Sequence, residues 1–169
     1  MSLFRISYVL LIILGFGLAS CKSGQKKYPN EPGKWRKKEQ KALIRGVIKS
    51  ARGYMGTPYK WGGTTRAGMD CSGLLYTCYK TQGVQIPRTS SEQSKFGNKV
   101  GKKNVKEGDW VFFAAGKKKR KITHVGIVSK VNGKEKIKFI HASSSLGVVE
   151  NDLFSNYYEK IYVRAVRPF

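Results

Sequence analysis

The stretch Met69-Asp70-Cys71-Ser72-Gly73-Leu74-Leu75 places a cysteine at the point where a helix is expected to begin. Asp70 is of the residue type that caps helix N-termini, and apolar residues at helical spacing follow it. Cys71 is therefore expected in the first turn, where unpaired N–H groups and the helix dipole favour negative charge. Such surroundings lower the pKa of a thiol and populate the reactive thiolate. The stretch predicts Cys71 as a nucleophile.

The two histidines of the chain both fall in runs that are typical of strands. His124 opens the run His124–Val128, and His141 lies within Phe139–Ser143. One activated cysteine and two strand histidines are the parts of a thiol hydrolase. We expect His124 to be the general base and His141 to hold the ring of His124 in the correct tautomer.

The other cysteine near this motif, Cys78, has a different interpretation. If Cys71 and Cys78 share one helix, a rise of about 1.5 Å per residue separates their Cα atoms by roughly 10 Å. A disulfide needs Cα atoms within about 7 Å. The two cysteines are therefore expected to be unpaired, with Cys78 as a small buried apolar side chain.

The N-terminus has the pattern of an export signal. The apolar run Tyr8–Leu18 is too short to span a bilayer but suits a signal peptide. The run ends in Leu18-Ala19-Ser20-Cys21, which resembles the bacterial lipobox. Residues 1–20 are thus predicted to be a signal peptide, Cys21 to carry the lipid, and residues 21–34 to form a flexible tether. The alternative is an ordinary secretory signal in which Cys21 is incidental.

The charge of the chain limits its partners. Lys and Arg total 33 against 10 Asp and Glu, a formal net charge of +23. Such an excess favours polyanionic surroundings. Because an exported protein rarely meets chromosomal DNA, we expect anionic envelope polymers or membrane and no nucleic acid, in a protein anchored to the membrane of the cell envelope. The run Lys117–Lys121 is interpreted as a solvated hairpin loop; alternatively it attracts substrate carboxylates near the cleft.

The remaining patterns predict an α+β fold. Apolar residues at helical spacing predict one helix within Trp35–Tyr54, a second from Cys71 to about Gln82, and a short third after Arg88. From Gly108 onward the pattern changes to strands, which we expect at 109–113, 124–131, 136–143, 147–149 and 162–166. The order predicts one domain, 35–169, with N-terminal helices packed on a central antiparallel sheet.

Several short motifs occur in order along this predicted domain. They are Tyr59-x-x-Gly-Gly, Asp70-Cys71-Ser72-Gly73, Pro87-Arg88-Thr89-Ser90-x-x-Gln93, Gly108-Asp109-x-Val-Phe-Phe, His124-Val-Gly-Ile and Phe139-Ile140-His141-Ala142. Together they resemble the NlpC/P60 cell-wall peptidases over about residues 40 to 167. The resemblance implies a papain-like α+β fold and hydrolysis of peptidoglycan stem peptides. The bond usually cut joins D-γ-glutamate to the diamino acid, meso-diaminopimelate or lysine.

The resemblance also implies roles for residues beyond the cysteine and the histidines. It places Tyr59 at the oxyanion site, alongside the backbone N–H of Cys71. The positions that match a substrate pocket are Asp70, Ser72, Arg88 and Ser90. From the residues alone, Tyr59 could equally belong to the core, Asp70 could only cap the helix, and Arg88 could be a surface charge. We expect a monomer that needs no cofactor and no metal.

Two other functions remain open at this point. An acyl-enzyme on Cys71 can be intercepted by an amine instead of water, which would make the chain an acyl or peptidyl transferase. A lipoprotein that binds the wall with an unused site is the second alternative. The intact set of one cysteine and two histidines favours the peptidase.

Overall fold

The computed structural model describes residues 36–116 and 121–169. The predicted signal peptide, the lipid attachment at Cys21 and the tether at 21–34 lie outside the described residues, as do residues 117–120 of the basic run. None of the described helices combines the length and apolar character needed to cross a bilayer.

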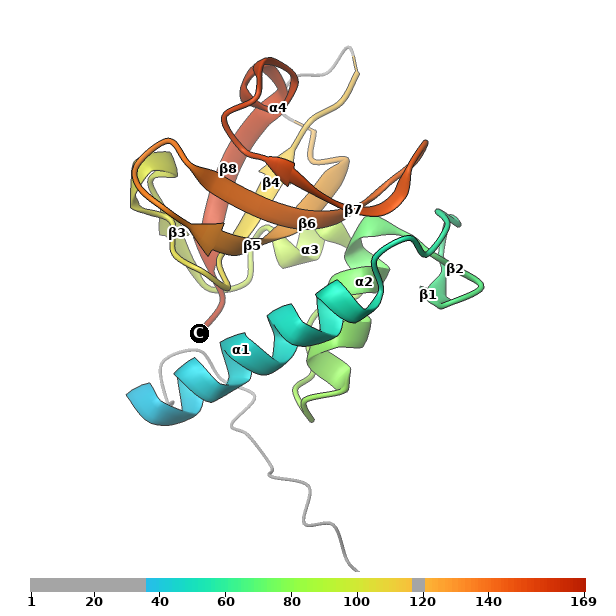
Figure 1. Cartoon of the computed structure of the whole chain (residues 1–169), viewed down its shortest axis with the longest axis horizontal. Helices are drawn as coiled ribbons and strands as arrows, with labels where there is room; N and C mark the ends of the chain where they lie inside the picture. Colours follow the sequence, from blue (N-terminus) through green and yellow to red (C-terminus); the bar gives the residue numbers. More distant parts are fainter. Residues whose placement is uncertain (1–35, 117–120) are drawn as a thin grey trace, which may run out of the picture.

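Helices and strands follow one another largely as the sequence predicts (Figure 1). The helices are α1 (Lys37–Gly53), α2 (Cys71–Lys80), α3 (Ser90–Gln93), α4 (Asn156–Ile161) and a 3₁₀ turn at Lys102–Asn104. A two-stranded hairpin precedes α2 and consists of β1 (Thr64–Thr65) and β2 (Gly68–Met69). The main sheet contains β3 (Asn98–Val100), β4 (Trp110–Phe113), β5 (His124–Val131), β6 (Ile137–Ser143), β7 (Gly147–Asp152) and β8 (Tyr162–Arg167).

The main sheet has the order β3-β8-β4-β5-β6-β7, and every pairing in it is antiparallel. Strand β4 is buried on both faces. Its Trp110 and Phe112 pack in the core that contains α1 and α2, whereas Val111 and Phe113 pack on the opposite face, where Tyr158 of α4 lies. This alternation follows from the two-residue period of a strand and puts helices on both faces of the sheet. The predicted α+β architecture with helices on an antiparallel sheet is confirmed.

Some elements differ from those that the sequence predicts. Strand β7 runs to Asp152 rather than ending at Val149. The strand Tyr162–Arg167 does not lie at the edge, because β3 pairs with it on its outer side. The strands β1, β2 and β3 and the helix α4 were not predicted. Each is too short to show a hydrophobic period, so the segments around it decide its conformation.

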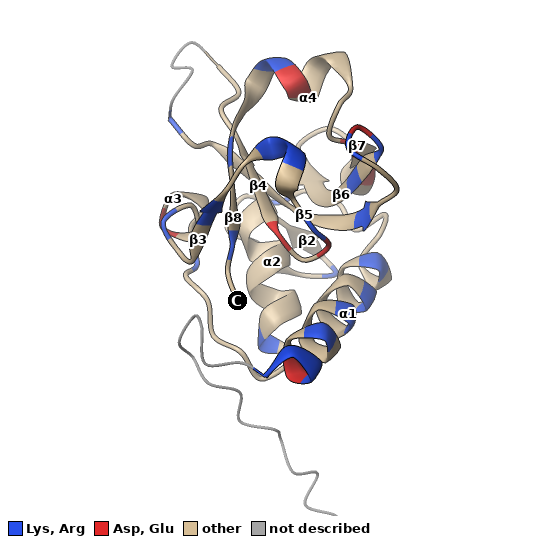
Figure 2. Ribbon diagram, turned by 90° about the vertical axis from the view of Figure 1, so that its left-hand side faces the viewer, with Lys and Arg blue, Asp and Glu red and all other residues tan. Residues whose placement is uncertain are grey.

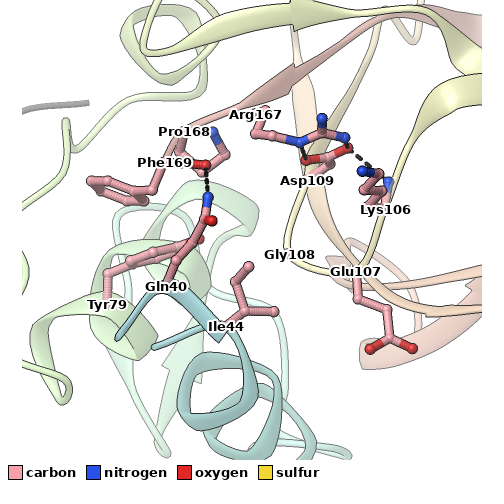
Figure 3. A pocket seen from close by; sticks show the side chains of 10 residues that line it. All are labelled: Gln40, Ile44, Tyr79, Lys106, Glu107, Gly108, Asp109, Arg167, Pro168 and Phe169. Carbon is pink, nitrogen blue, oxygen red and sulfur yellow. Dashed lines mark hydrogen bonds and ion pairs between the residues drawn. The ribbon is translucent and has the colours of Figure 1, made fainter. Parts of the chain in front are cut away.

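The end of the chain is locked into the sheet beside α1 (Figure 3). Arg167 donates two hydrogen bonds to Asp109, of 2.8 Å to Oδ1 and 2.7 Å to Oδ2. The backbone N–H of Lys106 donates to the same carboxylate at 2.8 Å, and Gln40 of α1 donates to the backbone carbonyl of Phe169. These residues line a cavity of about 220 Å³. The lock holds β8 and α1 together, and the cavity shares no lining residue with the one that contains Cys71.

The start of α2 is held by close backbone contacts. Asp70 caps the helix by accepting a 2.6 Å hydrogen bond from the N–H of Gly73, as predicted. The carbonyl of Gly63 accepts the N–H of Asp70 at 3.1 Å. A Cβ on Gly73 would lie 2.2 Å from that same carbonyl oxygen. Only glycine at position 73 lets the first turn of α2 approach the turn at 60–63 so closely.

We expect the Gly73→Ala substitution to destabilise the fold by about 1–3 kcal/mol, because the added methyl group must displace backbone rather than a flexible side chain. The matched control is Gly53→Ala at the end of α1, where a Cβ would meet no atom within 4 Å. That control is expected to be neutral or slightly stabilising. Urea unfolding of both variants measures the difference; equal stabilities would contradict the packing argument.

Candidate active site

Cys71 occupies the first position of α2, and its side chain is only 6% exposed. Backbone N–H groups of Val125 in β5 and of Ser72 and Cys71 in the helix favour its thiolate. Burial nevertheless raises the pKa of the Cys71 thiol to about 11, and the charge of Asp70 acts in the same direction. The prediction of a lowered pKa is therefore wrong. The N–H groups do favour the thiolate, but the loss of hydration outweighs them.

The two histidines lie on neighbouring strands and contact each other. Nε2 of His124 is 2.7 Å from Nδ1 of His141, with the two rings nearly perpendicular. Burial lowers the pKa of His124 to about 3, and the proximity of His141 adds to the effect. Burial lowers the pKa of His141 as well. At neutral pH both rings are uncharged, so one ring must donate and the other accept in the bond between them.

Sequence analysis missed two residues of this cluster. Nε2 of His141 lies 2.8 Å from Oδ1 of Asn151 and 3.0 Å from the hydroxyl of Tyr158. Tyr158 also donates to Oδ1 of Asn151 at 3.3 Å. Asn151 lies in the unpredicted half of β7 and Tyr158 in the unpredicted α4. Only the pairing of Asn151 with Phe139, two residues before His141, brings the amide to the ring, and no sequence motif marks it.

Of the four residues that match a substrate pocket, three are joined by hydrogen bonds and the fourth, Ser90, lines the same cavity. Arg88 donates to Asp70 through Nη1 at 3.0 Å and Nη2 at 2.7 Å, and to the hydroxyl of Ser72 at 3.0 Å. Ser72 donates to Asp70 at 2.9 Å. Burial opposes ionisation of Asp70, but hydrogen bonds from Arg88, Gly73 and Ser72 outweigh it and lower its pKa. Arg88 is thus an organised partner of Asp70, and its interpretation as a mere surface charge is wrong.

Two cavities meet at this site. One, of about 520 Å³, is lined by Cys71 and by Asp70, Ser72, Arg88 and Ser90. The other, of about 410 Å³, is lined by His124, His141, Asn151 and Tyr158. Tyr59 and Thr123 line both cavities, so the cavity of the thiol and the cavity of the histidine pair are neighbours.

Tyr59 stands where the two cavities join. Burial raises the pKa of its phenol, and the proximity of Cys71 and Asp70 raises it further. The phenol therefore keeps its proton at neutral pH and can donate a hydrogen bond into the cavity. This placement agrees with the position that the family resemblance implies, but Tyr59 also packs partly against the core.

The other chemistry-bearing groups behave more simply. Cys78 is 1% exposed within the core, and both described cysteines are free thiols, as predicted. Within residues 36–116 and 121–169, no group of three or more His, Cys, Asp or Glu side chains is arranged to hold a metal ion. The site therefore combines a neutral thiol, a neutral imidazole pair and a protonated phenol.

Comparison with known proteins places this chain in a family. The model of the NlpC/P60 family matches residues 56–167. The chain belongs to the NlpC/P60 family. It is 33% identical to the probable endopeptidase NlpC of Escherichia coli over 161 residues, which are 95% of this chain and 98% of that relative. The predicted family and its class, the cysteine peptidases, are confirmed.

Other NlpC/P60 relatives are longer proteins, and this chain matches part of each. The murein DD-endopeptidase MepS/murein LD-carboxypeptidase of Escherichia coli is 37% identical over 68% of this chain and 57% of its own length. The gamma-D-glutamyl-L-lysine dipeptidyl-peptidase of Bacillus subtilis is 39% identical over 53% of this chain and 30% of its own length. A crystal structure of an NlpC/P60 family protein from Bacillus cereus superposes with a TM-score of 0.64 at 34% identity, covering 73% of this chain and 39% of that one.

The raised thiol pKa predicts how Cys71 reacts with iodoacetamide. Because only the thiolate is alkylated, the rate should rise about tenfold per pH unit between pH 7 and 10. Peptide mass spectrometry after timed alkylation measures Cys71 and Cys78 separately, with Cys78 as the internal control, since its pKa is raised to about 12. A rate for Cys71 that is constant from pH 5 to 8 would show a thiolate–imidazolium pair and contradict the neutral state.

Proposed function

We propose that this chain is a cysteine endopeptidase that hydrolyses peptidoglycan stem peptides at the bond between D-γ-glutamate and the diamino acid, meso-diaminopimelate or lysine. One observation carries the proposal. Cys71 opens α2 and packs in the same core cluster as Val125, the residue directly after His124, while Nδ1 of His141 lies 2.7 Å from Nε2 of His124. A nucleophile, a base and a group that orients the base thus lie in one place.

Acylation follows from this arrangement. Nδ1 of His124 removes the thiol proton as Sγ of Cys71 attacks the carbonyl carbon of the scissile amide. The carbonyl π electrons move to oxygen, and the backbone N–H of Cys71 and the phenol of Tyr59 stabilise the oxyanion. When the intermediate collapses, the C–N bond breaks and His124 returns its proton to the leaving amine. The thioester of Cys71 remains.

Deacylation repeats the proton transfers with water. His124 takes a proton from water as the water oxygen attacks the thioester carbonyl, and returns it to the departing sulfur. The products are a carboxylic acid, which ionises, and the free thiol. An amine in place of water would give transfer instead. Relatives of this chain are named as peptidases, so hydrolysis is our choice and transfer the alternative that product analysis tests.

The choice of bond rests on similarity to the Bacillus subtilis relative, whose name specifies a γ-D-glutamyl-L-lysine bond. The MepS relative is named for a different, DD bond and aligns with more of this chain. We favour the γ-D-glutamyl bond because it is the bond that the family resemblance implies. Cleavage at the DD bond is the second candidate.

We further propose that the Asp70–Arg88–Ser72 cluster, with Ser90 beside it, shapes the wall that receives the substrate. Its hydrogen bonds hold the guanidinium and the hydroxyl in fixed positions in the cavity of Cys71. Fixed donors bind a polar substrate without ordering side chains first, which preserves binding energy.

The location of the enzyme is also part of the proposal. We infer that a lipid on Cys21 anchors it to a membrane of the cell envelope as a monomer, which in a diderm would be the outer membrane, facing the periplasm. The exposed basic residues Lys37, Lys41, Arg45 and Lys49 recur every four residues on α1, directly after the tether (Figure 2). Four-residue spacing puts them on one helix face, which suits an anionic surface.

Substitution of the nucleophile tests the function. In defined muropeptides, Cys71→Ala should abolish cleavage, because the thiol of Cys71 is the nucleophile that forms the acyl-enzyme. Cys78→Ala is the matched control and should keep the activity, with some loss of stability from the vacated core space. Mass spectrometry of the digests identifies the bond and distinguishes water from amine as acceptor. Near wild-type turnover in Cys71→Ala would overturn the proposal, and fragments cut at the DD bond would replace the γ-D-glutamyl assignment.

Substitution of Arg88 tests the pocket. Arg88→Gln should raise KM roughly tenfold or more with a smaller change in kcat, because charge-assisted hydrogen bonds that order the pocket are lost. The control is Arg45→Gln, which removes the same charge from the exposed face of α1. Steady-state kinetics on a soluble stem peptide measure both. Equal KM and kcat values in the two variants would show that Arg88 does not contribute to substrate binding.

A further inference from the structure

The group that sets the proton positions of the histidine pair is a neutral amide, and it lies outside the predicted triad. Oδ1 of Asn151 faces Nε2 of His141 at 2.8 Å. An amide oxygen only accepts hydrogen bonds. Nε2 of His141 therefore carries the hydrogen in this contact.

The hydrogen on Nε2 of His141 determines the direction of the hydrogen bond between the two histidines. Burial lowers the pKa of His141, so the ring is neutral and Nδ1 has no hydrogen. Nδ1 must then accept from Nε2 of His124 across the 2.7 Å contact. His124 in turn keeps its only hydrogen on Nε2, and its Nδ1 has a lone pair. That is the form in which His124 can take a proton from Cys71.

Tyr158 supports the orientation of the amide. Its hydroxyl donates to Oδ1 of Asn151 at 3.3 Å and lies 3.0 Å from Nε2 of His141. A hydroxyl that donates to Oδ1 can still accept from Nε2, so all three groups are satisfied together. The ring of Tyr158 packs against Phe113 and Phe139, which fixes its position.

In the described part of the chain, the groups that face this cluster carry no formal charge. The groups that face His141 are His124 from β5, Asn151 from β7 and Tyr158 from α4, with Tyr157 beside Tyr158. Among the described residues that line the cavity, none is Asp, Glu, Lys or Arg. A carboxylate at position 151 would favour an imidazolium on His141. An imidazolium donates from both nitrogens. Nε2 of His124 would then have to accept, and the hydrogen of the neutral His124 ring would move to its Nδ1.

We propose that Asn151, held by Tyr158, is a positioning residue that sets the tautomers of His141 and His124 and so keeps His124 competent as a base. The role of the base rests on the proposed peptidase function. The tautomers themselves do not, because they can be observed without any substrate.

The first arm of the test reads the tautomers directly. Long-range ¹H–¹⁵N spectra of the full chain at pH 7.5 should show both histidines with hydrogen on Nε2. In Asn151→Leu, which keeps the volume but cannot accept, His141 should become a mixture of tautomers. A wild-type His141 or His124 with hydrogen on Nδ1 would overturn the proposal whether or not the chain cleaves peptidoglycan.

The second arm reads catalysis on a soluble stem peptide. Asn151→Leu should lower kcat by a factor on the order of 10², the usual range for general-base catalysis, with KM within about twofold. Tyr158→Phe keeps the ring packing and should lose roughly two- to fivefold in kcat. A rise in KM with unchanged kcat would mean that Asn151 shapes the cavity instead, and would overturn the assignment.

The third arm uses pH. Asn151→Asp retains an acceptor and should keep the wild-type tautomers at pH 7.5 or above, but its charge raises the pKa of His141. Activity requires neutral His141, so the acidic limb of kcat/KM should move to higher pH by about one unit or more. Asn156→Asp adds the same charge at the exposed start of α4 and should leave the limb in place. If the acidic limbs of kcat/KM lie at the same pH in the two aspartate variants, the proposal is overturned. If the wild type shows the expected tautomers but does not cleave the peptide, the peptidase function alone is refuted.

Discussion

The seating of the first turn of α2 between β5 and the turn at 60–63 is the constraint on which the rest of the site depends. The carbonyl of Gly63 bonds the N–H of Asp70 and lies against the bare Cα of Gly73. On its other side, α2 packs against β5, and Cys71 and Val125 belong to one core cluster. The turn at 60–63 and the distant strand β5 thus meet at the first turn of α2. Any displacement of α2 would move the thiol away from the strand that carries His124.

The same seating determines the charge state of the site. A thiol in the first turn of an exposed helix would gain from the backbone N–H groups and lose little hydration. Here the thiol packs within the core, and the hydration that the thiolate loses outweighs the stabilisation from the N–H groups. The histidine pair is neutral for the same reason. An uncharged pair avoids the cost of burying ions, and charge develops only during proton transfer.

Sequence analysis succeeded where a pattern is local. The helical spacing of Leu43, Val47 and Ala51 predicts α1, and these residues are buried in the core. Asp70 predicts the cap of α2, and the apolar run from His124 predicts β5 with its observed bounds. The analysis failed where the neighbours decide: β3 exists because β8 pairs with it, and α4 has six residues, too few to show a period. The amide of Asn151 was missed together with the second half of β7.

The sequence by itself determined the family, the α+β order of elements and the identity of the cysteine and the histidines, because caps, periods and short motifs depend on residues close together in the chain. Only the tertiary structure decided the protonation states of Cys71 and His124, the engagement of Arg88 by Asp70, and the chain of acceptors that ends at Asn151. Those properties depend on hydration lost and partners gained between segments that are brought together only by folding, and no local pattern records either quantity.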